Sequence, residues 1–426
     1  MRIIVALCAL TLSACTGYSE RLQRAHRHYY GGQYGEAVAD LDALLANDEF
    51  EEHHPVLRLE KASALFAQGE FEAASREIES ADRTLQVLEF SSDPASLGKY
   101  FFSDSFGDYH APPYEKFFLP TINLLSYAAR QNLPDARTEA NLAYSRMDNY
   151  RKLENESKFE SPAAYLLLGF LDEIEGDRRD AEIAYKHANA RLDKLGFKHQ
   201  DYKVAENSEG EDKGDLVVVV LNGKSPVWID DRNYPKSKED PEVIDKTIDA
   251  VLQAISKDKR PQAGKAMRET SHVRIARLQK RSSRFTSASL SVAGKKLGEL
   301  DRVLDLEAQT LDWYDTVRSQ MVGAALFRVA TRVGGRIGIE TNLDDHTSAP
   351  LARLTGLAFE NILKEADVPD TRCWNLLPKD IFLSRVSLPV GEHAVEVAMG
   401  GQGSQAFKRS VKVEKGRPSF MVLVTP

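Results

Sequence analysis

The first half of the chain places apolar side chains at helical spacing. In the clearest stretch, Ala181, Tyr185 and Ala188 are separated by four and three residues, which puts them on one face of an α-helix. Gly169 and Gly176 precede them. Gly176 is expected to end one helix just before the next begins, and Gly169 to let the two helices approach closely. The pattern therefore predicts a pair of helices folded back on each other.

The same frame occurs three more times in the first 150 residues. The copies are Gly32, Ala37, Leu41, Leu44, then Gly69, Ala74, Ile78, Ala81 and, more weakly, Gln131, Ala136, Ala140, Ala143. This spacing resembles the tetratricopeptide repeat (TPR), a 34-residue pair of antiparallel helices. The resemblance implies a helical solenoid whose concave groove binds an extended peptide or a partner's helix. Unrelated helical hairpins are the alternative.

A long connection interrupts these repeats. Residues 90–115 carry six aromatic side chains, Tyr100, Phe101, Phe102, Phe106, Tyr109 and Tyr114. So many aromatic side chains in a connection of this length are unusual for a disordered linker. Two interpretations stay open: the segment fills the groove as part of the structure, which we favour, or it is an interaction surface.

The second half of the chain mixes strand and helix patterns. After a polar boundary at residues 206–214, the β-branched run 215–221 predicts a buried strand that ends at the Asn222-Gly223 turn. Alternation with period two predicts further strands over 272–278 and 286–292. Helices are predicted over 241–256, 300–333 and 351–365.

The end of the chain reads as strands joined by short turns. Residues 381–388 and 393–397 predict a β-hairpin, and 407–413 and 419–424 add two strands. This rhythm is similar to small bacterial surface β-sandwiches of the PEGA kind. The expected fold class is α+β: an N-terminal TPR-like α-helical solenoid over 15–205, then a mixed α/β domain over 214–426 that ends in an antiparallel sheet.

The first fifteen residues have the pattern of an export signal. Arg2 precedes an apolar run over 3–10 that is too short to span a bilayer. The run ends in Leu12-Ser13-Ala14-Cys15, which resembles the bacterial lipobox. On that resemblance residues 1–14 are a lipoprotein signal peptide, and Cys15 begins the mature chain and carries fatty-acyl groups such as palmitate. A plain secretory signal that contains a cysteine is the alternative.

The residue after Cys15 bears on the destination of the protein. Thr16 stands where Asp would retain many Gram-negative lipoproteins at the inner membrane. The sorting pattern therefore implies an outer-membrane lipoprotein that faces the periplasm.

The net charge limits the classes of partner that we expect, and the cysteine content limits the thiol chemistry. The formal net charge is −8, and −9 once Arg2 is removed with residues 1–14, which argues against nucleic acid and anionic lipid as general partners. No second apolar run reaches about 18 residues. Only Cys373 then remains as a thiol, so the mature chain forms no internal disulfide. We expect Cys373 to be a small buried apolar residue rather than a nucleophile.

One polar cluster stands out before the final strands. The stretch Asp370-Thr371-Arg372-Cys373-Trp374-Asn375-Leu376-Leu377-Pro378 resembles a family of uncharacterised bacterial TPR lipoproteins, in which Asp-Thr/Leu-Arg-Ser-Trp and Leu-Pro precede the last sheet. Cys373 stands where that family has Ser. Asp370, Arg372, Trp374 and Pro378 are the candidate structural or binding motif. The favoured interpretation is an Asp370–Arg372 ion pair and a tryptophan that fixes the sheet to the helices.

Other polar patterns give no catalytic or metal site. His26 and His28 are two apart on a helix and point to different sides. The runs 51–54 and 344–346 and the glycines of 400–403 match no specific metal or phosphate motif. We therefore expect no catalytic residue, no metal and no cofactor.

These patterns lead to a functional hypothesis by analogy with other TPR lipoproteins. The chain is expected to be a lipid-anchored periplasmic scaffold or adaptor that binds protein partners at the cell envelope through its TPR groove, with peptidoglycan association as a further expectation. The competing hypothesis is an enzyme that acts on cell-wall material, or a regulator of peptidoglycan synthesis, through the Asp370–Trp374 surface.

Overall fold

The computed structural model describes residues 18–89, 109–154, 160–205, 212–253, 255, 257–334, 369–415 and 418–426. Within these residues the chain is a mixed α+β protein, which confirms the predicted class at this level. Cys15, most of the 90–115 segment, the predicted helix over 351–365 and the acidic run 344–346 lie outside the described residues. Among the helices that are described, none has the length and apolar character needed to cross a membrane.

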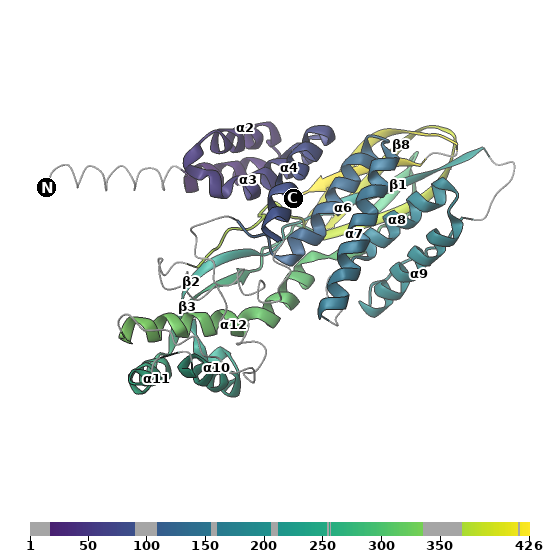
Figure 1. Cartoon of the computed structure of the whole chain (residues 1–426). Coiled ribbons are helices and arrows are strands. Elements are labelled where there is room, and N and C mark those ends of the chain that lie inside the picture. The colour runs from purple at the N-terminus through teal and green to yellow at the C-terminus, as the bar shows by residue number, and fades with distance from the viewer. Residues whose placement is uncertain are drawn as a thin grey trace.

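The first half is a row of helices. After a helix over 18–30 come α2 (Tyr34–Leu45), the 3₁₀ helix η1 (Asp48–His53), α3 (His54–Gln68), α4 (Phe71–Glu89), α6 (Pro113–Ala129), α7 (Leu133–Glu154), α8 (Pro162–Glu175) and α9 (Arg178–Lys194). Figure 1 shows them side by side, from α2 and α3 near the N-terminus to α8 and α9 at the opposite end. α3 packs on α4, α6 on α7, and α8 on α9.

Glycine shapes the hairpins as the sequence predicts. α3 ends at Gly69 and α8 ends at Gly176, with φ of 91° and 87°, a left-handed conformation that favours glycine. A Cβ on Gly169 would lie 2.5 Å from Tyr185 Cε1, because the Tyr185 ring of α9 rests on α8 at that point. Ala181 and Ala188 are fully buried in the same contact.

Two four-stranded sheets form most of the second half. One has the order β10-β1-β7-β6 and the other β5-β4-β8-β9. The strands are β1 (Lys213–Asn222), β4 (Phe285–Val292), β5 (Lys295–Glu299), β6 (Asp301–Asp305), β7 (Asp380–Pro389), β8 (Gly391–Gly401), β9 (Ser404–Val413) and β10 (Ser419–Thr425).

The sheets share a core, and one of them also packs on the helices. Alternate side chains of β1, such as Val218 and Val220, join residues of β4 and β8 in one hydrophobic cluster between the sheets. The intervening Val217 and Val219 join the main cluster, which includes the helical half. The sheet β10-β1-β7-β6 is therefore a central layer, with helices on one face and the second sheet on the other (Figure 1).

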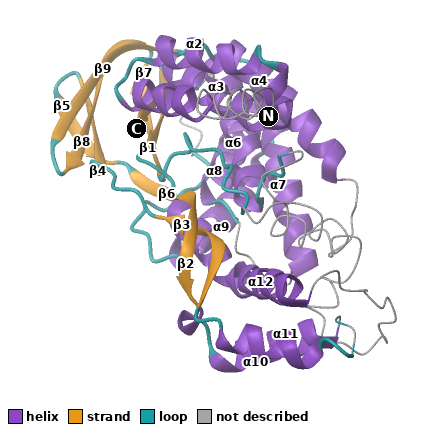
Figure 2. Ribbon diagram, turned by 90° about the vertical axis from the view of Figure 1, so that its left-hand side faces the viewer, coloured by secondary structure: helices purple, strands orange, loops and turns teal. Residues whose placement is uncertain are grey.

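A smaller group of elements extends from these layers. The ribbon β2 (Val227–Pro235) and β3 (His272–Gln279) encloses η2 (Lys236–Lys238), α10 (Pro241–Gln253) and α11 (Arg260–Glu269). The long helix α12 (Leu306–Gly334) packs against α10, α11 and β3. Figure 2 shows this group below the sheets.

The structure corrects three details of the sequence interpretation. The helix predicted over 300–333 begins only at Leu306, because residues 301–305 form β6, and the Asp305 side chain accepts a hydrogen bond from Ala308 N (2.8 Å) at the helix start. The strands over 381–388 and 393–397 do not form a hairpin: β7 pairs with β1 and β6, whereas β8 pairs with β4 and β9. The last strand, β10, lies parallel to β1, so the second half does not end in a purely antiparallel sheet.

Candidate functional site

The candidate motif lies in an extended segment, residues 369–379, that leads into β7. The segment has no helix and pairs only at an isolated bridge, yet Cys373, Trp374, Leu376, Leu377 and Pro378 are all buried. Hydrogen bonds from the helical half and from the loops around β1 replace regular secondary structure along it. We call it the tryptophan segment.

Trp374 fixes the tryptophan segment to two helices. Its side chain is 1% exposed, and its Nε1–H donates to Ser63 Oγ of α3 at 2.8 Å. Its backbone N–H donates to Glu115 Oε1 of α6 at 2.9 Å, and its ring meets that of Phe118 edge to face at 5.7 Å. This contact between the chain's end and its helices is the one the sequence predicted.

The next residue extends the contact to the first helices. Asn375 N donates to Glu60 Oε1 of α3 at 2.7 Å, while its carbonyl accepts from Tyr30 OH at 2.9 Å and from Arg281 at 2.6 Å. Tyr30, Glu60 and Glu115 belong to the first helices of successive hairpins. The tryptophan segment therefore lies along one face of the helical row. The sequence analysis considered residues 90–115, not this segment, as the part of the chain that fills a groove of the helices.

Asp370 and Arg372 form the expected ion pair. Arg372 Nη2 lies 2.7 Å from Asp370 Oδ2, and the backbone N–H of Arg372 donates to Asp370 Oδ1 at 2.9 Å. Arg372 Nη1 also donates to the carbonyl of Glu52 at 3.2 Å. The guanidinium therefore neutralises the carboxylate and joins the segment to η1.

Glu115 is an ionisable group at the centre of this contact. It is fully buried, and burial raises its pKa to about 8, although hydrogen bonds from the Tyr109 hydroxyl and from Trp374 N oppose the shift. Burial also raises the pKa of the Cys373 thiol well above its usual range. Cys373 is thus a neutral thiol, unsuited to nucleophilic attack.

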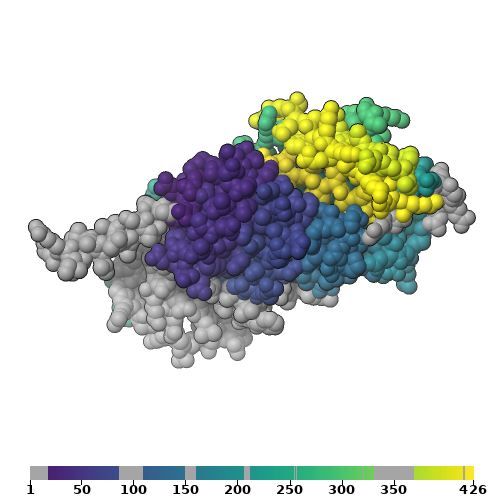
Figure 3. Space-filling model, turned by 90° about the horizontal axis from the view of Figure 1, so that it is seen from above, coloured from purple at the N-terminus to yellow at the C-terminus, as the bar shows by residue number. Residues whose placement is uncertain are grey.

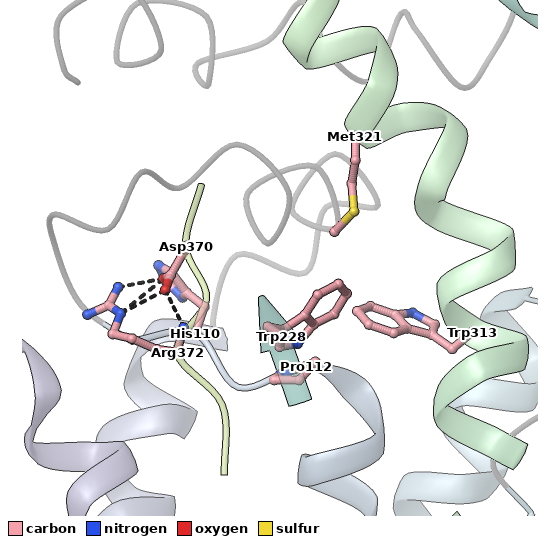
Figure 4. Close-up of a pocket in the computed structure, with 7 residues that line it drawn as sticks. All are labelled: His110, Pro112, Trp228, Trp313, Met321, Asp370 and Arg372. Atoms are coloured by element: carbon pink, nitrogen blue, oxygen red, sulfur yellow. Dashed lines mark hydrogen bonds and ion pairs between the residues drawn. The ribbon is translucent and has the colours of Figure 1, made fainter. Parts of the chain in front are cut away.

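A small cavity opens beside the ion pair. Figure 4 shows Asp370, Arg372 and His110 on one side and the rings of Trp228 and Trp313 on the other, with Pro112 and Met321 nearby. Its volume is about 30 Å³. Pockets for drug-sized ligands hold roughly 300–1,000 Å³, so the space around these described residues suits water.

The cavity wall is held by aromatic contacts. Trp228 Nε1 donates to Tyr114 OH at 3.1 Å, and the Trp228 and Trp313 rings meet edge to face at 6.0 Å. Tyr114 in turn meets Trp313 at 5.5 Å. The two tryptophans therefore join β2, α6 and α12, and the indole N–H of Trp228 is already bonded within the protein.

The sequence analysis identified the residues of the tryptophan segment but not their partners on the helices. The structure brings Asp370, Arg372 and Trp374 together, and it buries Pro378 outside the cavity lining. The partners Glu60 and Glu115 were missed. Their only signal was a carboxylate within an apolar helical run, which charge alone does not distinguish from a solvated residue.

The two histidines near the N-terminus each lie beside a separate carboxylate. His26 Nε2 lies 3.3 Å from Glu60 Oε2 and His28 Nδ1 lies 3.3 Å from Asp40 Oδ2, so the two rings face different carboxylates, as predicted. In the part of the chain that the structure describes, no three His, Cys, Asp or Glu side chains are placed to hold a metal ion.

Comparison of the chain with family models, with curated proteins and with solved structures finds no match.

Proposed function

We propose that this protein is a lipid-anchored scaffold of the bacterial envelope, attached through Cys15 to the outer membrane and facing the periplasm, which binds partner proteins. The observation that carries the proposal is the short separation in sequence between the lipobox-like residues and the first described helix. Tyr18 already belongs to the helix over 18–30, and its ring stacks on His53 at 4.5 Å. An acylated Cys15 is three residues away.

That spacing has a geometric consequence. Three residues of fully extended chain span at most about 10 Å. Lipid on Cys15 would therefore hold the first helices and η1 close to the membrane surface. The opposite end of the helical row, with α8, α9 and the sheets, would then face away from the membrane, where partner proteins have access (Figure 1).

The helical hairpins support a TPR-like scaffold. The frame residues Ala37, Ala74, Ala136 and Ala181 are all fully buried, and Gly169 lies under the ring of Tyr185. Stacked hairpins of this kind serve in many proteins as platforms for protein binding. Here the tryptophan segment covers one face of the row, so we place the partner on surfaces that the chain leaves exposed.

The proposal is tested by the fate of Cys15→Ser. The unchanged protein should incorporate labelled palmitate and fractionate with the outer membrane, because three acyl chains exceed the two-signal requirement for stable anchoring. Cys15→Ser should lose the label and leave a soluble or unprocessed protein. A Cys15→Ser protein that still matures and sediments with the outer membrane would contradict the proposal.

A further inference from the structure

The turn that follows β1 lies against a basic loop. The turn comprises residues 222–226, and the loop, residues 280–284 between β3 and β4, reads Lys-Arg-Ser-Ser-Arg without an acidic side chain. Lys224 N donates to Ser283 Oγ at 3.2 Å, and a Cβ on Gly223 would lie 2.3 Å from the same oxygen. Gly223 has φ of 75°, so glycine both adopts this turn and lets the loop approach it.

The turn and the loop each place a cation beside the ring of Tyr30, at the end of the first helix. Lys224 Nζ lies 4.1 Å from the centre of the ring, and Arg281 Cζ lies 5.5 Å from it. The ring attracts both cations but carries no net charge, so it does not neutralise them. Figure 3 shows the first helices, in purple, beside the C-terminal strands, in yellow, on the surface of the molecule.

Arg281 is held in place by neutral acceptors. Its Nε donates to Ser225 O at 2.6 Å, its Nη1 to Tyr30 OH at 2.7 Å and its Nη2 to Asn375 O at 2.6 Å. These three bonds fix the plane of the guanidinium, and none of the acceptors is charged. Arg281 is therefore positioned without an ion pair among the described residues.

The Lys224 ammonium has no compensating charge. Its side chain is half-buried, and burial lowers its pKa, as does the neighbouring Arg281 guanidinium. No carboxylate of the described residues opposes this shift. The three N–H donors of Lys224 contact only the Tyr30 ring in the part of the chain that the structure describes, so they are open to an acceptor from outside.

Two carboxylates of the surrounding elements already have partners. Glu60 Oε1 of α3 accepts from Asn375 N at 2.7 Å. Glu307 of α12 lies 3.5 Å from Lys379 Nζ and 3.9 Å from Lys280 Nζ. The turn and the loop therefore form a local excess of positive charge, in a chain whose formal net charge is −8.

We infer that Lys224 and Arg281 form a binding site for a phosphate group, carried by a soluble ester or by a lipid headgroup. The phosphate oxygens accept from the Lys224 ammonium, and the fixed Arg281 guanidinium adds a second positive charge. A phosphate ester carries about 1.5–2 negative charges at pH 7, which matches two cations better than a single carboxylate does. The site adds a ligand to the proposed scaffold and does not depend on lipid at Cys15.

The inference is tested on the purified full chain by acetylation of its lysines with acetic anhydride, followed by mass spectrometry. Glycerol 3-phosphate should protect Lys224 saturably, with half of the effect at or below about 1 mM. Sodium chloride at the same ionic strength should not protect it. Lys246 of α10 is exposed and paired with Glu242, and its acetylation should stay the same throughout.

A variant separates binding from a general effect of the anion on stability. Lys224→Met keeps an unbranched side chain beside Tyr30 and removes the charge. A ligand at ten times its Kd shifts the folding equilibrium by about tenfold, so glycerol 3-phosphate should raise the Tm of the unchanged protein above its value in sodium chloride. This rise should be absent from Lys224→Met and kept by the control Lys246→Met; circular dichroism checks that both variants are folded.

Vesicles distinguish the two sources of phosphate. Protection of Lys224 by glycerol 3-phosphate, and not by phosphatidylcholine vesicles that contain phosphatidic acid, assigns the site to a soluble ester. Protection by these vesicles, and not by pure phosphatidylcholine, assigns it to a lipid headgroup.

Two results would overturn the inference. One is that neither source protects Lys224 at up to about 10 mM phosphate groups, and the other is that Lys224→Met keeps the full rise in Tm. Neither assay involves Cys15. A failure here, with lipidation of Cys15 established, therefore rejects the phosphate site and leaves the anchored scaffold standing.

Discussion

At the scale of single residues, Trp374 holds the end of the chain against its helices. Its ring is buried, and its two N–H groups donate to Ser63 and Glu115, which lie on different helices. Replacing the side chain removes its packing and leaves Ser63 Oγ without the indole donor, whereas the backbone bond to Glu115 does not depend on the side chain. Both effects are large for a buried aromatic residue.

We therefore expect Trp374→Ala to lower the free energy of unfolding by about 3–5 kcal/mol. Trp374→Phe keeps most of the ring but loses the bond to Ser63, so its cost should be smaller, about 1–2 kcal/mol. Urea denaturation of the two variants measures both values. An alanine variant as stable as the unchanged protein would contradict the role assigned to this side chain.

Because of Glu115, the stability that this contact contributes to the fold depends on pH. In the unfolded chain a Glu carboxyl titrates near 4.5, whereas in the fold Glu115 keeps its proton up to about pH 8. The folded state therefore gains from Glu115 in full below about pH 4.5, and that gain is lost as the pH rises through 8. Glu139 and Asp380, whose pKa values burial raises to about 7 and about 6, act in the same direction.

Glu115→Gln should remove the largest part of this effect. We expect its free energy of unfolding to fall less between pH 5 and pH 8 than that of the unchanged protein, with Glu139 and Asp380 leaving a residual slope. Urea denaturation across this range measures the difference, and Glu72→Gln, at an exposed carboxyl, is the matched control. If Glu115→Gln shows the same fall as the unchanged protein, the buried carboxyl does not titrate as described.

At the scale of elements, the α8–α9 hairpin depends on one close approach. We expect Gly169→Ala to destabilise the protein by about 1–3 kcal/mol, because the new Cβ would lie 2.5 Å from the Tyr185 ring and overpack the hairpin. Gly298→Ala in β5 is the control, since a Cβ there meets nothing within 4 Å. Thermal melting compares them, and equal melting temperatures would refute the close packing.

The sequence predicts such hairpins well because their signals are local. Residues three to five apart set the helix faces, and glycine ends the helices at Gly69 and Gly176. Most strands were also predicted from local signals: alternation for β3 and β4, a β-branched run for β1, and strand patterns separated by turns at the end of the chain. The ribbon strand β2, the helix α11 and the short strands β5 and β6 were not, because their patterns are brief or interrupted by charge.

Local sequence patterns do not determine which strands pair or which residues contact the tryptophan segment. β7 and β8 are separated by one residue and yet belong to different sheets, while β1 and β10, about 200 residues apart, lie side by side. The Asp370–Arg372 pair could be predicted because its members are two residues apart. Glu115 and Glu60 could not, since they lie 259 and 315 residues from the backbone groups they accept from.

At the scale of the whole molecule, the helical half and the central sheet share one hydrophobic cluster. Arg385 of β7 adds a polar link: its Nη1 lies 2.7 Å from Glu173 Oε2 of α8, and its Nε donates to Asp215 Oδ2 of β1 at 3.1 Å. Removing one member of a buried ion network leaves its partners without compensation. These contacts couple the two regions energetically.

We expect the two regions to unfold together. Far-UV circular dichroism, which follows mainly the helices, and tryptophan fluorescence, whose three reporters Trp228, Trp313 and Trp374 sit where the regions meet, should give coincident urea transitions. Arg385→Met should move both transitions to lower urea by the same amount. Two separated transitions would contradict the coupling.

The central claim, a folded body held at the membrane by lipid on its first mature residue, is tested most directly by the mass of the N-terminal peptide. The protein would be purified from the membrane fraction of its own cells, digested, and its N-terminal peptide analysed by mass spectrometry. The account predicts a peptide that begins at Cys15 and carries a diacylglyceryl group and an amide-linked acyl chain. A mature peptide that begins elsewhere, or an unmodified Cys15, would contradict it.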